Sequence, residues 1–247
     1  MIRFKHLAAA AFVATLLAVI LGSMLTQLTW SRDDERYEEF IKAIERGDAN
    51  LVRRQIKDHM LYLSIEIPLD DYKRHYGATY PLHLACLHGQ LEVARELISL
   101  GADVNQADDF CRTPLYWSIC GSSEDDVSVA LAELLVKNGA DVDSLNSPPL
   151  ETALHSAVFC HSLAGVSTLL DLGANVNARS RDGKTPLHLL FNFTHEKNIE
   201  AVGKLLLEHG ADPSLKDRFG KACWDYLPPE KRTARLEAMF KVESNQE

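Results

Sequence analysis

Cysteine and histidine are the residues of this chain whose side chains are most capable of chemistry, because a thiolate is a nucleophile and an imidazole serves as base, acid or metal ligand. The 247-residue sequence contains five cysteines and ten histidines. Five is an odd number, and no short paired spacing occurs among them, so the sequence predicts neither a disulfide framework nor a zinc site. We expect free thiols in buried or half-buried positions.

An alternative function follows from Cys160 and His161, which are neighbours in the sequence. If a scaffold presented them together, the protein would be an enzyme with a thiol site, which requires a partly exposed thiol with a lowered pKa. Adjacency alone does not supply the positioned base that an activated nucleophile needs. No HExxH, GxSxG or phosphate-binding glycine motif occurs in the sequence. We therefore predict that the protein is not an enzyme, takes no cofactor and has no small-molecule substrate.

Aspartates recur at a fixed position, which raises the question of a metal site. Asp103, Asp141 and Asp212 each follow a Gly-Ala pair. A repeated turn explains this spacing without an ion, because an aspartate side chain stabilises a turn by hydrogen-bonding to the backbone of that turn. The sequence therefore predicts no metal site.

The overall charge bears on the class of partner. The formal net charge is −9, with 46% apolar and 25% charged residues. Nucleic-acid binding depends on a basic footprint that neutralises phosphates. An acidic chain of ordinary globular composition argues against nucleic acid as a main partner.

The elements that must position these residues are predicted by an internal repeat. Four blocks end in a turn in which Gly-Ala precedes aspartate or asparagine, beginning at Gly101, Gly139, Gly173 and Gly210. Each block opens with a matching segment: Tyr80-Pro81-Leu82-His83, Thr113-Pro114-Leu115-Tyr116, Thr152-Ala153-Leu154-His155 and Thr185-Pro186-Leu187-His188. Pro81 and Pro114 are 33 residues apart, and so are Thr152 and Thr185.

Each residue type in this unit has a physical role. Threonine caps a helix N-terminus, and proline fits the first helical position, where no amide hydrogen is missed. Glycine ends the second helix, because the left-handed backbone of a C-terminal cap costs it little. Apolar residues at helical spacing, as in Leu91, Ala94 and Leu97, give each helix one face to bury. Helices this short bury those faces only by stacking against neighbouring units.

The repeated unit resembles the ankyrin repeat, and the resemblance covers roughly residues 35–227. It implies an all-α fold: a solenoid of helix–turn–helix repeats with β-hairpin finger turns. It also implies that His83, His155 and His188 make structural hydrogen bonds between repeats. In this family the fingertips and the ends of the first helices line a concave side that contacts the partner.

The chain is divided accordingly. Its parts are an N-terminus in the cytoplasm (1–6), a signal anchor or transmembrane helix (7–28), a degenerate N-terminal capping repeat (33–60), an insertion (61–79) expected to be irregular over 61–71, four repeats (80–112, 113–151 with an insertion, 152–184 and 185–221), and C-terminal capping helices with a tail (222–247).

Residues 7–28 carry no charged side chain and consist mostly of apolar residues. About 20 such residues in a helix span the ~30 Å hydrocarbon layer of a membrane. Arg3 and Lys5 precede the segment, so the positive-inside rule predicts a cytoplasmic N-terminus and repeats on the far side, which is the periplasm in a bacterium. The alternative is a cleaved signal peptide and a soluble exported protein, although the candidate cleavage sites place bulky residues where small ones are required.

Candidate contact residues follow from the concave side that the resemblance implies. They are Leu87, His88, Phe110, Arg112, Phe159, Arg181, Lys184, Phe193, Arg218, Phe219 and Lys221. Exposed aromatic side chains with arginine nearby are typical of interaction hot spots. Basic residues on the last two fingers favour a partner with an acidic patch.

These observations predict a non-enzymatic module that is tethered to a membrane and binds a protein partner. Inhibiting, stabilising or recruiting a secreted or periplasmic enzyme would each fit this description. The remaining alternative is a structural spacer, in which the terminal helix or the membrane segment drives self-association.

Overall fold

A computed structural model of the chain describes residues 35–58, 63, 67–68, 78–121, 125–146, 151–160, 162–191, 199–229, 232–233, 236 and 240. The chain divides into two compact units, Met1–Lys42 and Ala43–Glu247. In the first unit the structure describes the beginning of helix α2 (Glu35–Arg46), in which the Phe40 side chain is buried. The four repeated segments all lie in the second unit.

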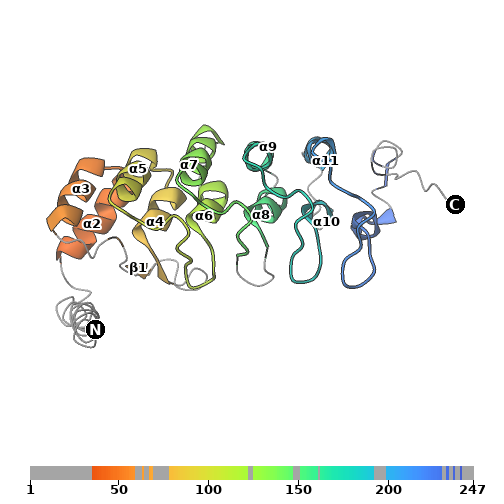
Figure 1. Cartoon of the computed structure of the whole chain (residues 1–247), viewed down its shortest axis with the longest axis horizontal. Helices are drawn as coiled ribbons and strands as arrows, with labels where there is room; N and C mark the ends of the chain where they lie inside the picture. Colours follow the sequence, from red (N-terminus) through yellow and green to blue (C-terminus); the bar gives the residue numbers. More distant parts are fainter. Residues whose placement is uncertain are drawn as a thin grey trace, which may run out of the picture. The chain divides into compact units, whose positions relative to one another are not determined.

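The second unit is built from short helices that follow one another in pairs (Figure 1). The pairs are α4 (Pro81–Leu87) with α5 (Leu91–Ser99), α6 (Pro114–Cys120) with α7 (Asp125–Lys137), α8 (Ala153–Phe159) with α9 (Leu163–Asp171), and α10 (Pro186–Leu189) with α11 (Ile199–Glu208). Helix α3 (Ala49–Asp58) precedes the pairs, and the 3-10 helix η3 (Cys223–Tyr226) follows them.

The helices stack in two rows within this unit. The first helices of the pairs pack successively, α4 on α6, α6 on α8, α8 on α10 and α10 on η3. The second helices do the same, from α3 through α5, α7 and α9 to α11 (Figure 1). Helix pairs that contact their sequence neighbours form a solenoid, in which stacking buries the faces that single units leave open. The predicted solenoid is therefore present in the described residues.

The core lies between the two rows and between successive pairs. Ala94 and Leu97 of α5 are fully buried, as are Val166 and Leu169 of α9. These positions belong to the apolar stripes that the helical spacing predicts. Within the row of second helices, Arg53 of α3 forms an ion pair with Glu96 of α5.

The helix boundaries follow the local residue types. Helices α6 and α10 begin at Pro114 and Pro186, as predicted. Thr113 precedes α6 in an extended conformation, but its side chain makes no cap hydrogen bond. Gly101 follows the end of α5 with φ +99°, which confirms the left-handed turn expected of that glycine.

A loop with a tight turn follows each pair, and we call these turns fingers. The first finger is 106–112, the third 178–184 and the fourth 215–221; of the second, 144–151, the structure describes 144–146 and 151. In Figure 1 the loops that carry the fingers extend to one side of the first helices. The fingers are therefore candidates for a contact surface.

The segment predicted to be an insertion, 61–79, contains two short strands. Strand β1 (Ile67–Pro68) pairs antiparallel with β2 (Ala78–Thr79), with Ile67 opposite Thr79. Strand β1 lies within 61–71, the part expected to be irregular, and its backbone pairing satisfies the polar groups beside the buried Ile67.

Among the described residues, no helix combines the length and the apolar character needed to cross a bilayer. The predicted membrane segment 7–28 lies outside the described residues.

Candidate protein-binding surface

The fingers share one backbone construction. Three of them are closed by an N–H that donates to a carbonyl four residues later: Asp108 to Arg112 at 3.0 Å, Ser180 to Lys184 at 2.9 Å and Asp217 to Lys221 at 2.9 Å. In the second finger Asn146 N donates to Glu151 O at 2.8 Å, five residues later. In the first, third and fourth fingers, this hydrogen bond closes the turn that carries the side chains of the tip.

A left-handed residue completes the turn. Gly183 and Gly220 take this position in the third and fourth fingers, with φ of +73° and +74°. In the first finger the same position is Cys111, with φ +57°. A residue with a β-carbon is disfavoured in this region, so the first finger carries a local strain that the other two avoid.

Buried histidines brace the fingers from the preceding first helices. Each Nε2 lies within hydrogen-bonding distance of a carbonyl oxygen: His83 to Arg112 at 3.1 Å, His155 to Lys184 at 3.0 Å and His188 to Lys221 at 3.1 Å. Since a carbonyl only accepts, Nε2 carries the proton. The three histidines thus make structural hydrogen bonds, as predicted, but each bond joins a first helix to the finger at the end of the same repeat and not to another repeat.

The hydrogen-bond partner of the other ring nitrogen, Nδ1, depends on which residue opens the repeat. In His155 and His188, Nδ1 accepts a hydrogen bond from the backbone N–H of Thr152 and Thr185 and lies 2.9 Å from the threonine hydroxyl. In the repeat of His83, Tyr80 stands in the position of these threonines. The Nδ1 atom of His83 is buried and has no hydrogen-bond partner. Burial lowers the pKa of His83 and of His155 to about 4, so both rings are neutral near pH 7.

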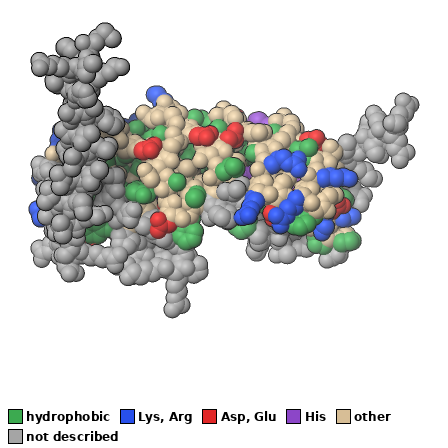
Figure 2. Space-filling view, turned by 60° about the horizontal axis from the view of Figure 1, so that its bottom comes forward, with side chains coloured by type: hydrophobic (Ala, Val, Ile, Leu, Met, Phe, Trp, Pro, Cys, Tyr) green, Lys and Arg blue, Asp and Glu red, His purple; other side chains and the backbone are tan. Residues whose placement is uncertain are grey.

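The third and fourth fingers carry most of the positive charge on this side of the unit, and we call them the cationic fingers. Together they contain six basic and two acidic residues, a local net charge of +4 in a chain of −9. Figure 2 shows lysine and arginine side chains gathered on this face, with few acidic ones among them. The positive charge predicted for these fingers is therefore concentrated on them, while the rest of the described residues are acidic overall.

The two cationic fingers are tied to each other. Arg218 N donates to Asp182 O at 2.9 Å, and the Arg218 guanidinium forms an ion pair with the Asp182 carboxylate at 2.9 Å. The Arg179 guanidinium donates to the Lys216 carbonyl. These contacts fix the distance between the fingers, which lets the remaining cations present a defined pattern.

Tyr226 of η3 lies beneath the cationic fingers. The ammonium groups of Lys184 and Lys221 are 4.5 Å and 5.3 Å from its ring centroid, distances at which a cation is attracted to the ring face. Its hydroxyl donates to the Asp217 carboxylate. Burial and this hydrogen bond raise the pKa of Tyr226 to about 12, so the hydroxyl remains a donor at physiological pH.

Large apolar side chains are exposed on two of the fingers and at the end of α8. Phe110 of the first finger is 39% exposed, Phe159 at the end of α8 is 46% exposed, and Phe219 of the fourth finger is 60% exposed. The guanidinium of Arg218 lies 4.7 Å from the Phe219 ring centroid. Aromatic surface beside arginine combines apolar area with a charged group, the composition of binding hot spots.

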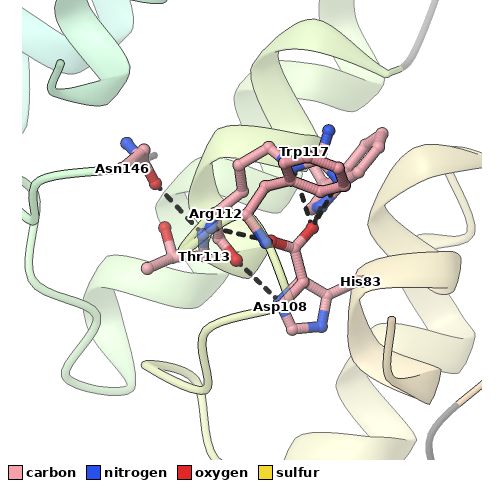
Figure 3. A network of polar contacts seen from close by, with 7 residues as sticks. His83, Asp108, Arg112, Thr113, Trp117 and Asn146 are labelled. Atoms are coloured by element: carbon pink, nitrogen blue, oxygen red, sulfur yellow. Dashed lines mark hydrogen bonds and ion pairs between the residues drawn. The ribbon is translucent and has the colours of Figure 1, made fainter. Parts of the chain in front are cut away.

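Arg112 does not take the exposed position that was expected. Its guanidinium is buried in the first finger, where it forms an ion pair with Asp108 at 2.8 Å and lies 4.3 Å from the Trp117 ring centroid (Figure 3). Trp117 Nε1 also donates to Asp108, at 3.0 Å. A charge is stable in such a place only when it is paired and hydrogen-bonded. Arg112 therefore builds the finger, and its prediction as an exposed contact residue is corrected.

The first and fourth fingers are constructed alike. An aspartate, Asp108 or Asp217, accepts two backbone N–H groups of its own finger and a donor from an aromatic side chain nine residues later. In both, a phenylalanine follows two residues after the aspartate and is exposed. The unit thus presents two similar aromatic tips from different repeats.

The other predicted contact residues occupy varied positions. His88 and Arg181 are exposed, and Leu87 is half-buried at the end of α4. Lys184 is half-buried, and Lys221 and Arg218 are exposed. Phe193 lies outside the described residues.

Two exposed leucines were missing from the sequence-based candidates. Leu145 of the second finger is 48% exposed, and Leu163 at the start of α9 is 41% exposed. Leu145 occupies the position that Arg179 and Lys216 hold in the cationic fingers, and this alignment of the fingers was the signal that could have identified it.

The candidate thiol Cys160 is exposed and lies near another thiol, Cys120, on the adjacent repeat. His161 lies outside the described residues. No group of three or more His, Cys, Asp or Glu side chains suited to a metal ion occurs in the described part of the chain.

Comparison with known sequences identifies the repeat. A family model described as ankyrin repeats (three copies) matches residues 40–146 and 126–217, together more than half of the chain. A probable 26S proteasome regulatory subunit p28 of Saccharomyces cerevisiae is 32% identical over 177 residues, covering 69% of this chain and 72% of that protein.

Two further relatives are much longer than the matched region. The nuclear factor NF-kappa-B p105 subunit of Gallus gallus is 34% identical over 133 residues, covering 53% of this chain and 13% of that protein. Palmitoyltransferase AKR1 of Lachancea kluyveri is 28% identical over 228 residues, covering 77% of this chain and 29% of that enzyme. The chain spans less than a third of the length of either.

Proposed function

Because the chain belongs to the ankyrin-repeat family, a family of protein-interaction modules, we propose that it is a non-enzymatic module that binds a protein partner through its fingers. The partner we propose presents an acidic patch to the cationic fingers and an apolar area to the aromatic tips. The observation that carries this proposal is the +4 charge of those two fingers, beside the exposed Phe219, in a chain of net charge −9.

Each component of this surface has a separate effect on binding. Opposite charges accelerate association and fix the orientation of the partner, while adding less to affinity. Aromatic side chains contribute affinity, because they bury a large apolar area with few rotatable bonds. The contacts between the third and fourth fingers hold these groups in place before binding, which reduces the entropy lost on association.

We propose further that residues 7–28 anchor the module in a membrane, with the N-terminus in the cytoplasm and the repeats on the other side, in the periplasm if the source is bacterial. The support is the uncharged apolar run and the basic residues before it. Protease added to intact spheroplasts should then digest the repeats. Digestion that begins only after lysis would contradict this topology.

Charge reversal tests the binding surface. The full chain in detergent, carrying Arg181→Glu and Lys216→Glu on the two cationic fingers, is immobilised and exposed to an extract of the exported proteins. We expect it to lose at least about tenfold in retention of a partner that the unchanged chain holds, because both cations are exposed on the fingers that we propose bind the acidic patch. Added salt should weaken the unchanged complex in the same direction.

The matched control reverses two exposed cations on the helices, Arg54→Glu on α3 and Lys137→Glu on α7, with the same change in net charge. This control should retain the partner. Phe110→Ala with Phe219→Ala should reduce retention without changing its dependence on salt. Equal retention by the finger variant and the helix control would remove the assignment of the cationic fingers.

A further inference from the structure

Two cysteine sulfurs from adjacent repeats lie close together at the protein surface. Cys120 is the last residue of α6, Cys160 directly follows α8, and their Sγ atoms are 3.8 Å apart. The two residues are 40 positions apart in the sequence, and packing of α6 against α8 brings them together. Cys160 is exposed and Cys120 is half-buried. A small reagent in solution therefore has access to the pair.

The two thiols differ in reactivity. The contact with Cys120 lowers the pKa of Cys160 to about 7, because the Cys120 thiol can donate to a Cys160 thiolate, although burial acts in the opposite direction. The same contact, together with burial, raises the pKa of Cys120. The thiolate is the reactive form. Cys160 is therefore the attacking group and Cys120 the neighbouring thiol.

We propose that Cys120 and Cys160 form a redox modification site, which a small-molecule disulfide of the glutathione class converts into an intramolecular disulfide. The Cys160 thiolate first attacks one sulfur of the reagent, whose S–S bond breaks; a mixed disulfide forms on Cys160, and one reagent thiolate leaves. Cys120 then gives up its proton and attacks the Cys160 sulfur, expelling the second thiolate. The two protein thiols are oxidised, and the reagent is reduced to two thiols.

The geometry requires only a local movement. A disulfide bond is about 2.0 Å long, so the two sulfurs must approach each other by about 1.8 Å. Rotation of the Cys160 side chain, which lies beyond the last residue of α8, supplies part of this approach. The bond would link two consecutive repeats beside the exposed Phe159.

The other three cysteines serve as internal comparisons. Cys86 and Cys223 are buried, and burial raises the pKa of both thiols. Cys111 is exposed on the first finger. The site is therefore distinguished from the buried cysteines by access and from Cys111 by its neighbouring thiol. This inference is independent of partner binding.

The test uses the full chain in detergent with Cys111→Gly, a substitution that suits the left-handed backbone of that position. The reduced protein is incubated with oxidised glutathione, and its accessible thiols are then labelled with a maleimide. We expect the two accessible thiols of this variant to fall to none, with no glutathionyl mass retained on the chain. Peptide mapping should recover Cys120 linked to Cys160, and a dithiol reductant should reverse the change.

A second variant removes the neighbouring thiol. With Cys120→Ser added, one glutathionyl group should stay on Cys160, because no thiol is in place to expel it. Circular dichroism establishes that each variant is folded; if the Cys120→Ser chain does not fold, the peptide map of Cys111→Gly decides alone. Stable glutathionylation without the Cys120–Cys160 link, or linked dimers in place of it, would overturn the proposal.

Discussion

One atom distinguishes Asp143 from the residues that hold its position in the neighbouring turns. Asn105 accepts a hydrogen bond from Asp141 N at 2.8 Å and donates to the Gly139 carbonyl at 2.9 Å. Asn177 makes the same two bonds to the next turn, with Asp212 N and the Gly210 carbonyl. Asp143 accepts from Asn175 N at 2.9 Å. Its carboxylate cannot donate, so the second bond is missing between these two repeats.

We predict that Asp143→Asn restores this bond, with the Gly173 carbonyl as acceptor, and raises the free energy of unfolding by about 1 kcal/mol. Urea titration of the variant and the unchanged chain measures the difference. The matched control is Asn177→Asp, which removes the equivalent donor and should destabilise by a similar amount. Changes of the same sign in both variants would contradict this account.

Residue types alone did not predict how Arg112 is used. The repeat placed it correctly on the first finger, where Lys184 and Lys221 stand in later fingers. Its burial depends on Asp108 and Trp117, which converge on its guanidinium only in the folded chain. A side chain at a fingertip position can therefore serve the finger itself, and the sequence pattern does not distinguish the two uses.

At the scale of single elements, histidines on three of the short first helices hold the fingers by hydrogen bonds. A neutral ring is required, because Nε2 donates to a finger carbonyl while Nδ1 of His155 accepts from Thr152 N. Protonation of Nδ1 would place two N–H groups against each other. The stability of the fingers is therefore linked to pH.

We predict that the free energy of unfolding falls as the pH decreases from about 6.5 to about 4. Burial lowers the pKa of His83 and His155 to about 4 in the folded chain, whereas an unfolded histidine titrates near pH 6.5. Between these values the unfolded state binds more protons, so acidification favours it. Urea unfolding at pH values from about 7 to about 5 measures the slope.

His155→Gln isolates one contribution, because glutamine keeps a donor for the Lys184 carbonyl and does not titrate. Its free energy of unfolding should be lower at neutral pH but should fall less steeply on acidification. Identical slopes in the variant and the unchanged chain would show that this histidine does not carry the linkage.

The local motifs predicted the elements well where each residue acts within its own turn. Pro114 and Pro186 start helices as expected, and Gly101 takes the left-handed conformation. The pairing of β1 with β2 and the approach of Cys120 to Cys160 were not predicted. Both depend on contacts between different segments of the chain, and residue spacing within one segment does not predict how close two segments come in the fold.

At the scale of the whole second unit, an aromatic cluster closes the C-terminal end of the described stack. Phe191, Trp224 and Phe240 have ring centroids 5.1 to 6.2 Å apart, and Phe191 meets the other two rings edge to face. Phe191 and Phe240 are buried. Terminal repeats of a solenoid must cover a face that would otherwise meet water, and this cluster covers that face after α10.

We predict that Phe240→Ala destabilises the chain by about 3 kcal/mol, the cost of deleting a buried aromatic ring. Hydrogen exchange should show the loss of protection first in α10 and η3, which lie next to the cluster. Phe219→Ala is the matched control, because the same substitution at a side chain that is 60% exposed should leave stability nearly unchanged. Equal losses in the two variants would remove the capping role.

The histidine bonds also run in one direction along the polypeptide. His83, His155 and His188 each grip a finger that comes after them in the chain. During synthesis on the ribosome, each of these three fingers therefore emerges after the histidine that binds it. Successive repeats can then fold in the order of translation, and each folded repeat offers the surface on which the next one stacks.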